Sequence, residues 1–203
     1  MASNEVNRTT RPRAQRVDAR RNRQRLLAAA RTVFAAEGAN ASLQGIAREA
    51  GVGIGTLYRH FPARETLYTA VYESEVDQLA ARAAALADAP DPAAALRDWL
   101  QALVALVATK TGMIAALAIS AETKSAVSQA TSARLVEALD GLLARCIAHD
   151  QLRDALGARD LLHAVVGMCL IQTEPDWQQR VAPMIDVLID GLRRADRDSS
   201  ART

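Results

Sequence analysis

Four polar side chains lie close together in one short, otherwise apolar stretch of the chain: Thr56, Tyr58, Arg59 and His60. Hydroxyl groups and the N–H groups of arginine and histidine donate hydrogen bonds to phosphate oxygens and to the edges of bases. Leu57, between them, is the kind of residue that a small domain buries. The stretch therefore combines groups that can contact nucleic acid with an apolar anchor.

The other residues that could do chemistry do not form a recognisable site. His149 and His163 are isolated, and Cys146 and Cys169 lie in apolar stretches without a CxxC or Cys/His cluster. The sequence holds no recognisable catalytic triad, paired carboxylates or phosphate-binding glycine loop. We expect no enzyme, no metal site and no cofactor, and interpret both cysteines as buried small hydrophobes in a reducing cytoplasm.

Two short helices joined by a tight turn are expected to position the polar cluster. Ser42 is suited to cap a helix at 43–50, the glycine-containing run 51–53 suits a tight turn, and a second helix is expected at 54–61. Two such helices pack at a steep angle, so that one crosses the phosphate backbone while the other enters the major groove. Residues 42–61 are therefore predicted to form a helix-turn-helix that docks on DNA.

The same residues resemble the DNA-binding region of the TetR (tetracycline repressor) family. The resemblance rests on SLQGIAREAGVGIGTLYRHF at 42–61 and PARETLYTAV at 62–71, in unbroken register with a helix expected at 20–37 and with Gly38. It covers about residues 20–79. Beyond them the similarity is architectural only, since members of the family carry a divergent helical effector-binding and dimerisation domain there.

The resemblance implies roles for individual residues of the helix-turn-helix. The expected phosphate contacts are Ser42, Thr56, Tyr58, His60 and Arg64. The surface that faces base edges in relatives is occupied here by Gly53, Ile54, Gly55 and Arg59. Relatives often carry polar or basic side chains at positions 53 and 54, so hydrogen-bonded base reading is expected to fall on Thr56 and Arg59, while Ile54 contacts a thymine methyl group.

Each of these roles has an alternative that the sequence leaves open. Tyr58 and Phe61 could be core aromatics, Arg59 could be a solvated surface charge, and His60 could be structural or merely exposed. Gly53 and Gly55 could serve turn geometry and close helix approach alone.

Positive charge is concentrated at the N-terminal end. Residues 1–68 contain 12 arginines and 5 acidic residues, a net charge of +7, whereas the rest of the chain has a net charge of −5. Residues 1–19 have no periodic apolar stripe and are expected to form a flexible, arginine-rich arm. Such an arm is either a solvated tail or tracks DNA, with Arg20 and Arg23 as the nearest candidates for contact.

The fold is expected to be all-α. The chain is 50% hydrophobic but only 3% aromatic and rich in alanine, which suits closely packed helices. A DNA-binding domain at 20–79 is expected to continue through a long fourth helix into a helical effector-binding and dimerisation domain at 80–195, followed by a flexible tail at 196–203. Helices in that second domain are expected at 92–110, 113–121, 124–148, 158–173 and 176–195.

The last two expected helices each present a wide apolar surface. This surface is predicted either to pack against a second copy of the chain or to be buried in the core of a single chain. The expected dimer-interface residues are Leu162, Val166, Leu170, Ile185, Leu188 and Leu192. The residues expected to line an apolar effector pocket, or alternatively to be ordinary core, are Trp99, Leu103, Met113, Leu117, Met168 and Trp177.

These observations predict a homodimeric, ligand-responsive regulator of transcription. It is expected to repress from a palindromic operator in double-stranded DNA and to be released by a small apolar effector. The alternatives are an activator or a ligand-independent regulator of the same fold, and, in other classes, a helical enzyme or a protein-binding adaptor. The chain has no signal-peptide pattern and no apolar run of about 18 residues, so a cytoplasmic protein without a membrane partner is expected.

Overall fold

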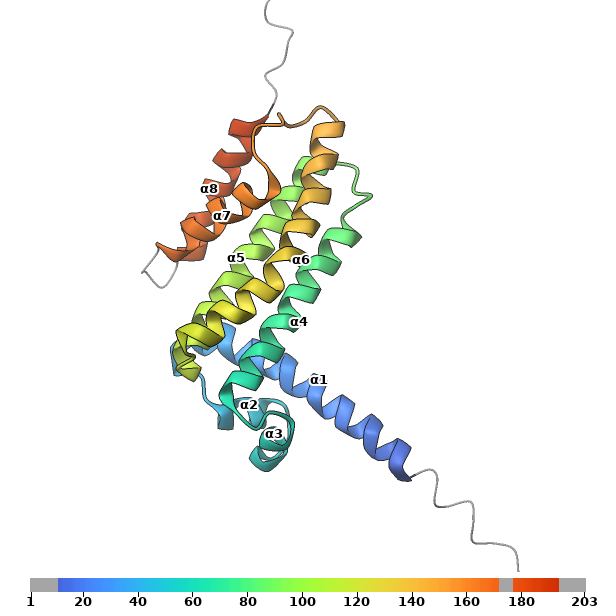
Figure 1. Ribbon diagram of the computed structural model, residues 1–203, viewed down its shortest axis with the longest axis vertical. Coiled ribbons are helices and arrows are strands. Elements are labelled where there is room, and N and C mark those ends of the chain that lie inside the picture. The colour runs from blue at the N-terminus through green and yellow to red at the C-terminus, as the bar shows by residue number, and fades with distance from the viewer. Residues whose placement is uncertain (1–10, 172–176, 194–203) are drawn as a thin grey trace, which may run out of the picture. The chain divides into compact units, whose positions relative to one another are not determined.

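The computed structural model describes residues 11–171 and 177–193, and every regular element among them is helical. This confirms the predicted all-α fold (Figure 1). The elements are α1 (Arg11–Glu37), the short 3-10 helix η1 (Gly38–Asn40), α2 (Leu43–Glu49), α3 (Ile54–His60), α4 (Arg64–Ala85), α5 (Pro92–Leu117), α6 (Ala121–Ala148), α7 (Ala158–Leu170) and α8 (Trp177–Leu192).

The chain divides into two compact units, which we call unit 1 and unit 2. Unit 1 takes the described residues of 1–72 together with 111–123, and unit 2 takes those of 73–110 and 124–203. The boundary therefore falls inside α4, α5 and α6 rather than in a linker. The expected division after residue 79 differs from this one, and it did not include the return of 111–123 to the first unit.

Helix α1 begins at Arg11 and not at Arg20, which corrects the expectation of a flexible arm up to residue 19. Pro12 falls in the first turn of the helix, where a missing N–H removes no hydrogen bond, so it marks the start rather than a break. The arginines and glutamines that follow are good helix formers even without an apolar stripe. Residues 1–10 and the expected tail 196–203 lie outside the described residues.

Helix α5 runs unbroken through Gly112, where two helices at 92–110 and 113–121 were expected. A Cβ atom at position 112 would lie 3.2 Å from the Cα of Gly38 and 3.2 Å from the carbonyl oxygen of Phe34, so this glycine allows a close approach of two backbones. The helix ends instead at Ala118, which adopts a left-handed conformation (φ +50°). Ile119 N–H donates to the carbonyl of Ile114 at 3.2 Å and closes the end.

Unit 1 is held together by large apolar side chains from each of its helices. Helices α1 and α2 pack on each other, as do α2 and α3. Five side chains of this core are almost fully buried: Leu26, Phe34, Ile46, Leu57 and Tyr68. The core is the miniature hydrophobic centre that a helix-turn-helix requires.

Unit 2 contains α7, α8 and the greater part of α4, α5 and α6, with α4, α5 and α6 running lengthwise in Figure 1. Trp99 on α5 is fully buried, and its indole Nε1 donates to the carbonyl oxygen of Leu79 at 2.8 Å. Arg82 makes a two-pronged contact with Asp98 at 3.0 and 2.7 Å, which joins α4 to α5. The helices of unit 2 are thus fastened by both core packing and surface ion pairs.

Helix α5 is long and apolar enough, by length and composition, to cross a membrane. Within unit 2, however, Leu96, Trp99, Leu100 and Leu103 on this helix are fully buried. The apolar character of α5 is that of a core helix.

Both cysteines agree with their interpretation as small buried hydrophobes. Cys146 and Cys169 are buried and free. Burial raises the pKa of each thiol to about 11, so both remain protonated at neutral pH.

Candidate nucleic-acid interface

Helix α2 begins with a side-chain cap, as its sequence predicted. The Oγ of Ser42 accepts a hydrogen bond from the N–H of Gly45 at 3.0 Å, and Ser42 itself is extended (φ −125°, ψ 149°). The hydroxyl hydrogen of Ser42 remains available to an acceptor such as a phosphate oxygen. Ile46 and Ala47 turn inward and are buried, which fixes the outward face of the helix.

The turn between α2 and α3 depends on a left-handed residue at Gly51. Its φ is +63°, a conformation that other residues rarely adopt, and its N–H donates to the carbonyl of Arg48 at 3.0 Å. The N–H of Val52 donates to Ala47 at 3.0 Å and closes the turn. These bonds set the direction in which α3 leaves α2.

Helix α3 is only two turns long and is anchored by a single inward residue. Leu57 is 1% exposed, whereas Ile54 and Tyr58 are 38% and 48% exposed. The N–H groups of Thr56 and Leu57 donate to the carbonyl of Gly53 at 2.8 and 3.3 Å, so the helix starts at Ile54. One face of α3 is buried and the opposite face is open to a partner.

Every residue predicted to contact DNA remains accessible at the surface of unit 1. Tyr58 is therefore not a core aromatic, whereas Phe61 is buried. The exposed members of the set are Arg20, Arg23, Ser42, Gly53, Ile54, Gly55, Tyr58, Arg59 and Arg64. The half-buried members are Thr56 and His60.

The two glycines at the start of α3 are not explained by the local fold. Gly53 has an ordinary φ of −71°, and a Cβ atom added at Gly53 or Gly55 would meet nothing within 4 Å. Turn geometry and helix approach within unit 1 therefore do not require glycine there. Backbone without side chains is therefore exposed at positions 53 and 55, on either side of the exposed Ile54.

Two arginines of α1 contact the residues that flank α3, the helix expected to enter the major groove. The guanidinium carbon of Arg23 lies 5.2 Å from the centre of the Phe61 ring, directly after α3. A Nη2 atom of Arg25 lies 3.5 Å from the carbonyl oxygen of Gly51, just before α3. The sequence singled out Arg23 as a DNA contact but gave no role to Arg25, because the rotation of α1 against the turn is a tertiary property.

The residues predicted for an effector pocket are divided between the two units. Trp99, Leu103, Met113 and Leu117 are buried, and the first two belong to unit 2 while the other two belong to unit 1. The described cavities of unit 2 are lined by other residues, among them Gln101 and Gln178. Met168 and Trp177 are half-buried, and they do not line these cavities either.

Half of the residues predicted for a dimer interface are instead core of the single chain. Leu162, Ile185 and Leu192 are buried in unit 2, because they face α7 or α8 neighbours within the chain. Leu170 is 67% exposed, and Val166 and Leu188 are half-buried. Val187, on the apolar surface expected of the last helix, is exposed, and sequence reasoning missed the exposed apolar residues Ile171 and Met184.

Comparison with known proteins identifies both parts of the chain. Residues 26–71 match the family described as "Bacterial regulatory proteins, tetR family". Residues 91–194, half of the chain, match the family described as "Transcriptional regulator SbtR-like, C-terminal domain". This chain belongs to the TetR family.

Solved structures agree over nearly the whole fold. A TetR transcriptional regulator from Streptomyces coelicolor is 35% identical, covers 85% of this chain and 99% of its own, and superposes with a TM-score of 0.73. A TetR regulator from Mycobacterium vanbaalenii is 32% identical over 89% of this chain and 99% of its own, with a TM-score of 0.67.

Curated relatives match the DNA-binding end. An HTH-type transcriptional regulator of Staphylococcus aureus is 44% identical over 63 residues, which are 30% of this chain. The match spans about a third (34%) of the length of that relative. The chain is thus a DNA-binding transcriptional regulator of the TetR family and not an enzyme.

Proposed function

We propose that this TetR-family regulator is a cytoplasmic homodimer that represses transcription from a palindromic operator and is released by a small uncharged effector. The observation that carries the proposal is the exposed face of α3, where Thr56, Tyr58 and Arg59 surround a surface without side chains at Gly53 and Gly55. Backbone without side chains lets α3 approach base edges closely, while the hydroxyl and guanidinium groups contact phosphates and bases.

Dimerisation is supported by apolar residues that the single chain leaves uncovered. Leu170 and Ile171 at the end of α7 are 67% and 79% exposed, and Met184 and Val187 on α8 are 42% and 73% exposed. We call these four residues the α7–α8 apolar patch. The two helices pack on each other, and exposed apolar residues on such a pair suit an association site.

A glycine on α7 supports the same surface. Gly167 lies one turn before Leu170 and Ile171, and a Cβ atom there would meet nothing within 4 Å in the chain. Glycine inside a helix costs about 1 kcal/mol relative to alanine, so its presence favours close approach by a second helix. A second copy of the chain is the partner we propose.

Two recognition helices are needed because a two-turn α3 spans only a few base pairs. A symmetric dimer presents two such helices about 34–36 Å apart, to half-sites one helical turn apart. Arg20 and Arg23 of α1 add positive charge beside each helix-turn-helix. If about four to six phosphates are neutralised per protomer, the salt slope of operator binding has a magnitude of roughly 7 to 11.

The test begins with inverted repeats in the intergenic DNA upstream of the coding region, using mobility shift of the full chain. Wild type should bind one such repeat as a dimer, and Arg59→Ala should weaken binding at least about tenfold through the loss of a base or phosphate contact. Arg159→Ala, an exposed arginine on α7, is the matched control and should bind as wild type does. Failure of wild type to bind any repeat at low salt would overturn the proposal.

The direction of regulation is tested separately with a promoter and reporter. Deletion of the gene should raise reporter expression if the regulator represses, whereas a fall would establish an activator. Expression that never changes with any small molecule would indicate a ligand-independent regulator.

A further inference from the structure

Helices α5 and α8 pack side by side in opposite directions, and an ion pair defines their register. Nε of Arg97 on α5 donates to Oδ1 of Asp186 on α8 at 2.6 Å, and its Nη2 lies 3.4 Å from Asp190. Because the helices are antiparallel, residues after Arg97 on α5 lie opposite residues before Asp186 on α8. The ion pair therefore closes one end of the seam between the two helices.

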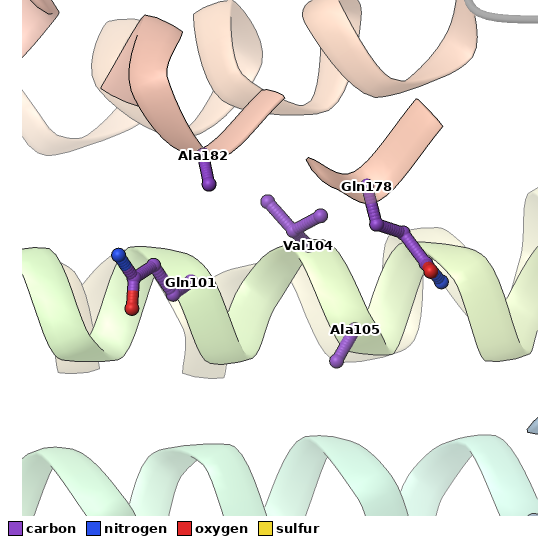
Figure 2. Close-up of a pocket in the computed structure, with 5 residues that line it drawn as sticks. All are labelled: Gln101, Val104, Ala105, Gln178 and Ala182. Atoms are coloured by element: carbon purple, nitrogen blue, oxygen red, sulfur yellow. The ribbon is translucent and has the colours of Figure 1, made fainter. Parts of the chain in front are cut away.

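Beyond the ion pair the seam opens into a cavity of about 350 Å³. One turn after Arg97, Gln101 lies at the level of Ala182, and one turn later Ala105 lies at the level of Gln178 (Figure 2). Each level thus sets a glutamine on one helix against an alanine on the other. The described residues that line the cavity are Gln101, Val104, Ala105, Gln178 and Ala182.

The alanines explain why the seam is open at these two levels. In Figure 2 the methyl group of Ala182 points from α8 toward α5, beside Gln101 and Val104. Val104 is buried and forms the apolar floor between the two glutamines. A branched side chain at position 182 would occupy the space that the methyl group leaves.

Both glutamine side chains have unused hydrogen-bonding capacity. Neither the Gln101 nor the Gln178 amide has a hydrogen bond to another described residue. Each amide offers two N–H donors and a carbonyl acceptor, so the pair can accept from and donate to the same ligand. Small-molecule sites typically combine a few polar groups with an apolar lining, as do these two amides beside Val104.

The cavity carries no charged group among its described lining residues, and this distinguishes it from its neighbour. A second cavity, about 460 Å³ and on the α4 side of Ala105, is lined by the charged residues Glu75 and Arg82. Gln101, Ala105 and Gln178 are exposed, so the cavity is open to solvent on one side, and a charged ligand would find no opposite charge among its described lining residues. The described lining residues therefore favour an uncharged ligand over an anion or a cation.

We propose that the cavity between α5 and α8 is the effector site and that it takes a small neutral molecule with an amide-like or carbonyl head group and a short aliphatic body. The head group bonds to Gln101 and Gln178, and the body lies on Val104. This inference rests on the proposed function, because it assigns the effector of that regulator.

A ligand in this site would contact the same helix that carries part of the proposed dimer interface. Ala182 on α8 faces the cavity, while Met184 and Val187 on the same helix belong to the α7–α8 apolar patch. A ligand that changes the seating of α8 on α5 therefore changes the surface that the second copy contacts. By linkage, a ligand that favours one seating shifts the population toward it.

The experiment titrates the full-length dimer with three probes of matched shape: hexanamide, hexanoate and hexylammonium. Ligand-observed NMR should give hexanamide a Kd on the order of 1 mM, as expected of a fragment, with both charged probes at least about tenfold weaker. Gln101→Leu and Gln178→Leu should each weaken hexanamide about three- to tenfold by removing a hydrogen bond. Ala182→Leu should abolish binding by filling the cavity.

Ala133→Leu, the same substitution at an exposed position of α6, is the control and should bind hexanamide as wild type does. Equal binding of the three probes, undiminished binding by Ala182→Leu, or no hexanamide binding at about 10 mM would each overturn the inference.

The same preparations are tested for operator binding. Operator binding without a probe response refutes only the effector site, whereas loss of operator binding by wild type refutes the proposed function itself.

Discussion

The guanidinium carbon of Arg23 lies 5.2 Å from the centre of the Phe61 ring. Helix α1 therefore contacts the residue that directly follows α3. Phe61 is 2% exposed and its own N–H donates to Leu57 at 2.8 Å, which ties this residue to α3. A cation over an aromatic face contributes about 0.5–1 kcal/mol at an exposed site. Arg23 therefore has a positioning role besides the DNA contact that we propose for it.

Replacing Arg23 by alanine should lower both the stability of unit 1 and the affinity for operator DNA. We expect a loss of about 0.5–1 kcal/mol in unfolding free energy, measured by denaturant titration, from the missing ring contact. Arg21→Ala is the matched control, because Arg21 is equally exposed and has no described ring contact. Equal stability of the two variants would show that the contact with Phe61 contributes nothing measurable.

Alanine substitutions at Gly51 and Gly55 should separate the two uses of glycine in the helix-turn-helix. Gly51→Ala should destabilise the protein by about 1 kcal/mol or more, because its φ of +63° strains any residue with a Cβ. The flexible end of Arg25, 2.6 Å from the new Cβ, can move aside. Gly55→Ala should stabilise α3 by up to about 1 kcal/mol, because it lies in a helix with open space around it.

The readout for this pair is thermal unfolding together with operator affinity. Gly55→Ala should fold at least as well as wild type yet bind DNA more weakly, since its methyl group lies on the face that approaches the bases. If Gly55→Ala binds the operator unchanged, close approach of the backbone at this position is not part of recognition.

Substitutions at Gly112, inside α5, and at Ala118, directly after it, should change the stability in opposite directions. Gly112→Ala should destabilise by about 1–3 kcal/mol, because its Cβ would press on Gly38 and Phe34 at 3.2 Å. Ala118→Gly should stabilise by about 1 kcal/mol, because it relieves a left-handed alanine. Calorimetry of both variants checks the pair. Gly141→Ala, in open space on α6, is the control and should not destabilise.

Tyr68 should make the protein sensitive to alkaline pH. Its hydroxyl is fully buried and has no hydrogen-bond partner among the described residues. Burial, with a smaller contribution from Tyr72, raises the pKa of Tyr68 from 10.0 to about 12. Between these values the unfolded chain loses the phenolic proton while the folded chain keeps it. The free energy of unfolding should therefore fall by about 2–3 kcal/mol as pH rises from 10 to 12, and be unaffected below 10.

Tyr68→Phe should reduce this decline and should also stabilise the protein by about 1 kcal/mol at neutral pH, since it removes a buried hydroxyl without a partner. Tyr58→Phe, at a position 48% exposed, is the control and should keep the decline of wild type. Chemical denaturation at several pH values gives the measurement. The same decline in Tyr68→Phe as in wild type would assign it to other groups.

Local signals explain why the helix-turn-helix was predicted well. The Ser42 cap, Gly51 in the turn and the apolar anchor Leu57 each act within a few residues, so their pattern is legible in the sequence. Helices α2 and α3 end within one residue of their expected bounds. All proposed DNA-contact residues are accessible for the same reason, since the periodicity that buries Ile46 and Leu57 exposes their neighbours.

Features that depend on distant parts of the chain were not predicted. Gly112 was read as a helix stop because its close neighbour Gly38 is far away in sequence. Arg25 gained no role because its position over Gly51 depends on how α1 rotates. The pattern of α8 showed that it is apolar, but not that Ile185 faces inward while Met184 and Val187 face outward.

The surroundings of Trp99 have a spectroscopic consequence. The chain has two tryptophans, and both lie in unit 2. Trp99 is fully buried and its indole N–H donates a hydrogen bond to the carbonyl oxygen of Leu79. Trp177 is half-buried and directly precedes Gln178. Intrinsic tryptophan emission from this protein is therefore silent about residues within unit 1 and contains one constant, blue-shifted component. A change in its colour on adding a small molecule is expected to come mainly from Trp177, in the first turn of α8.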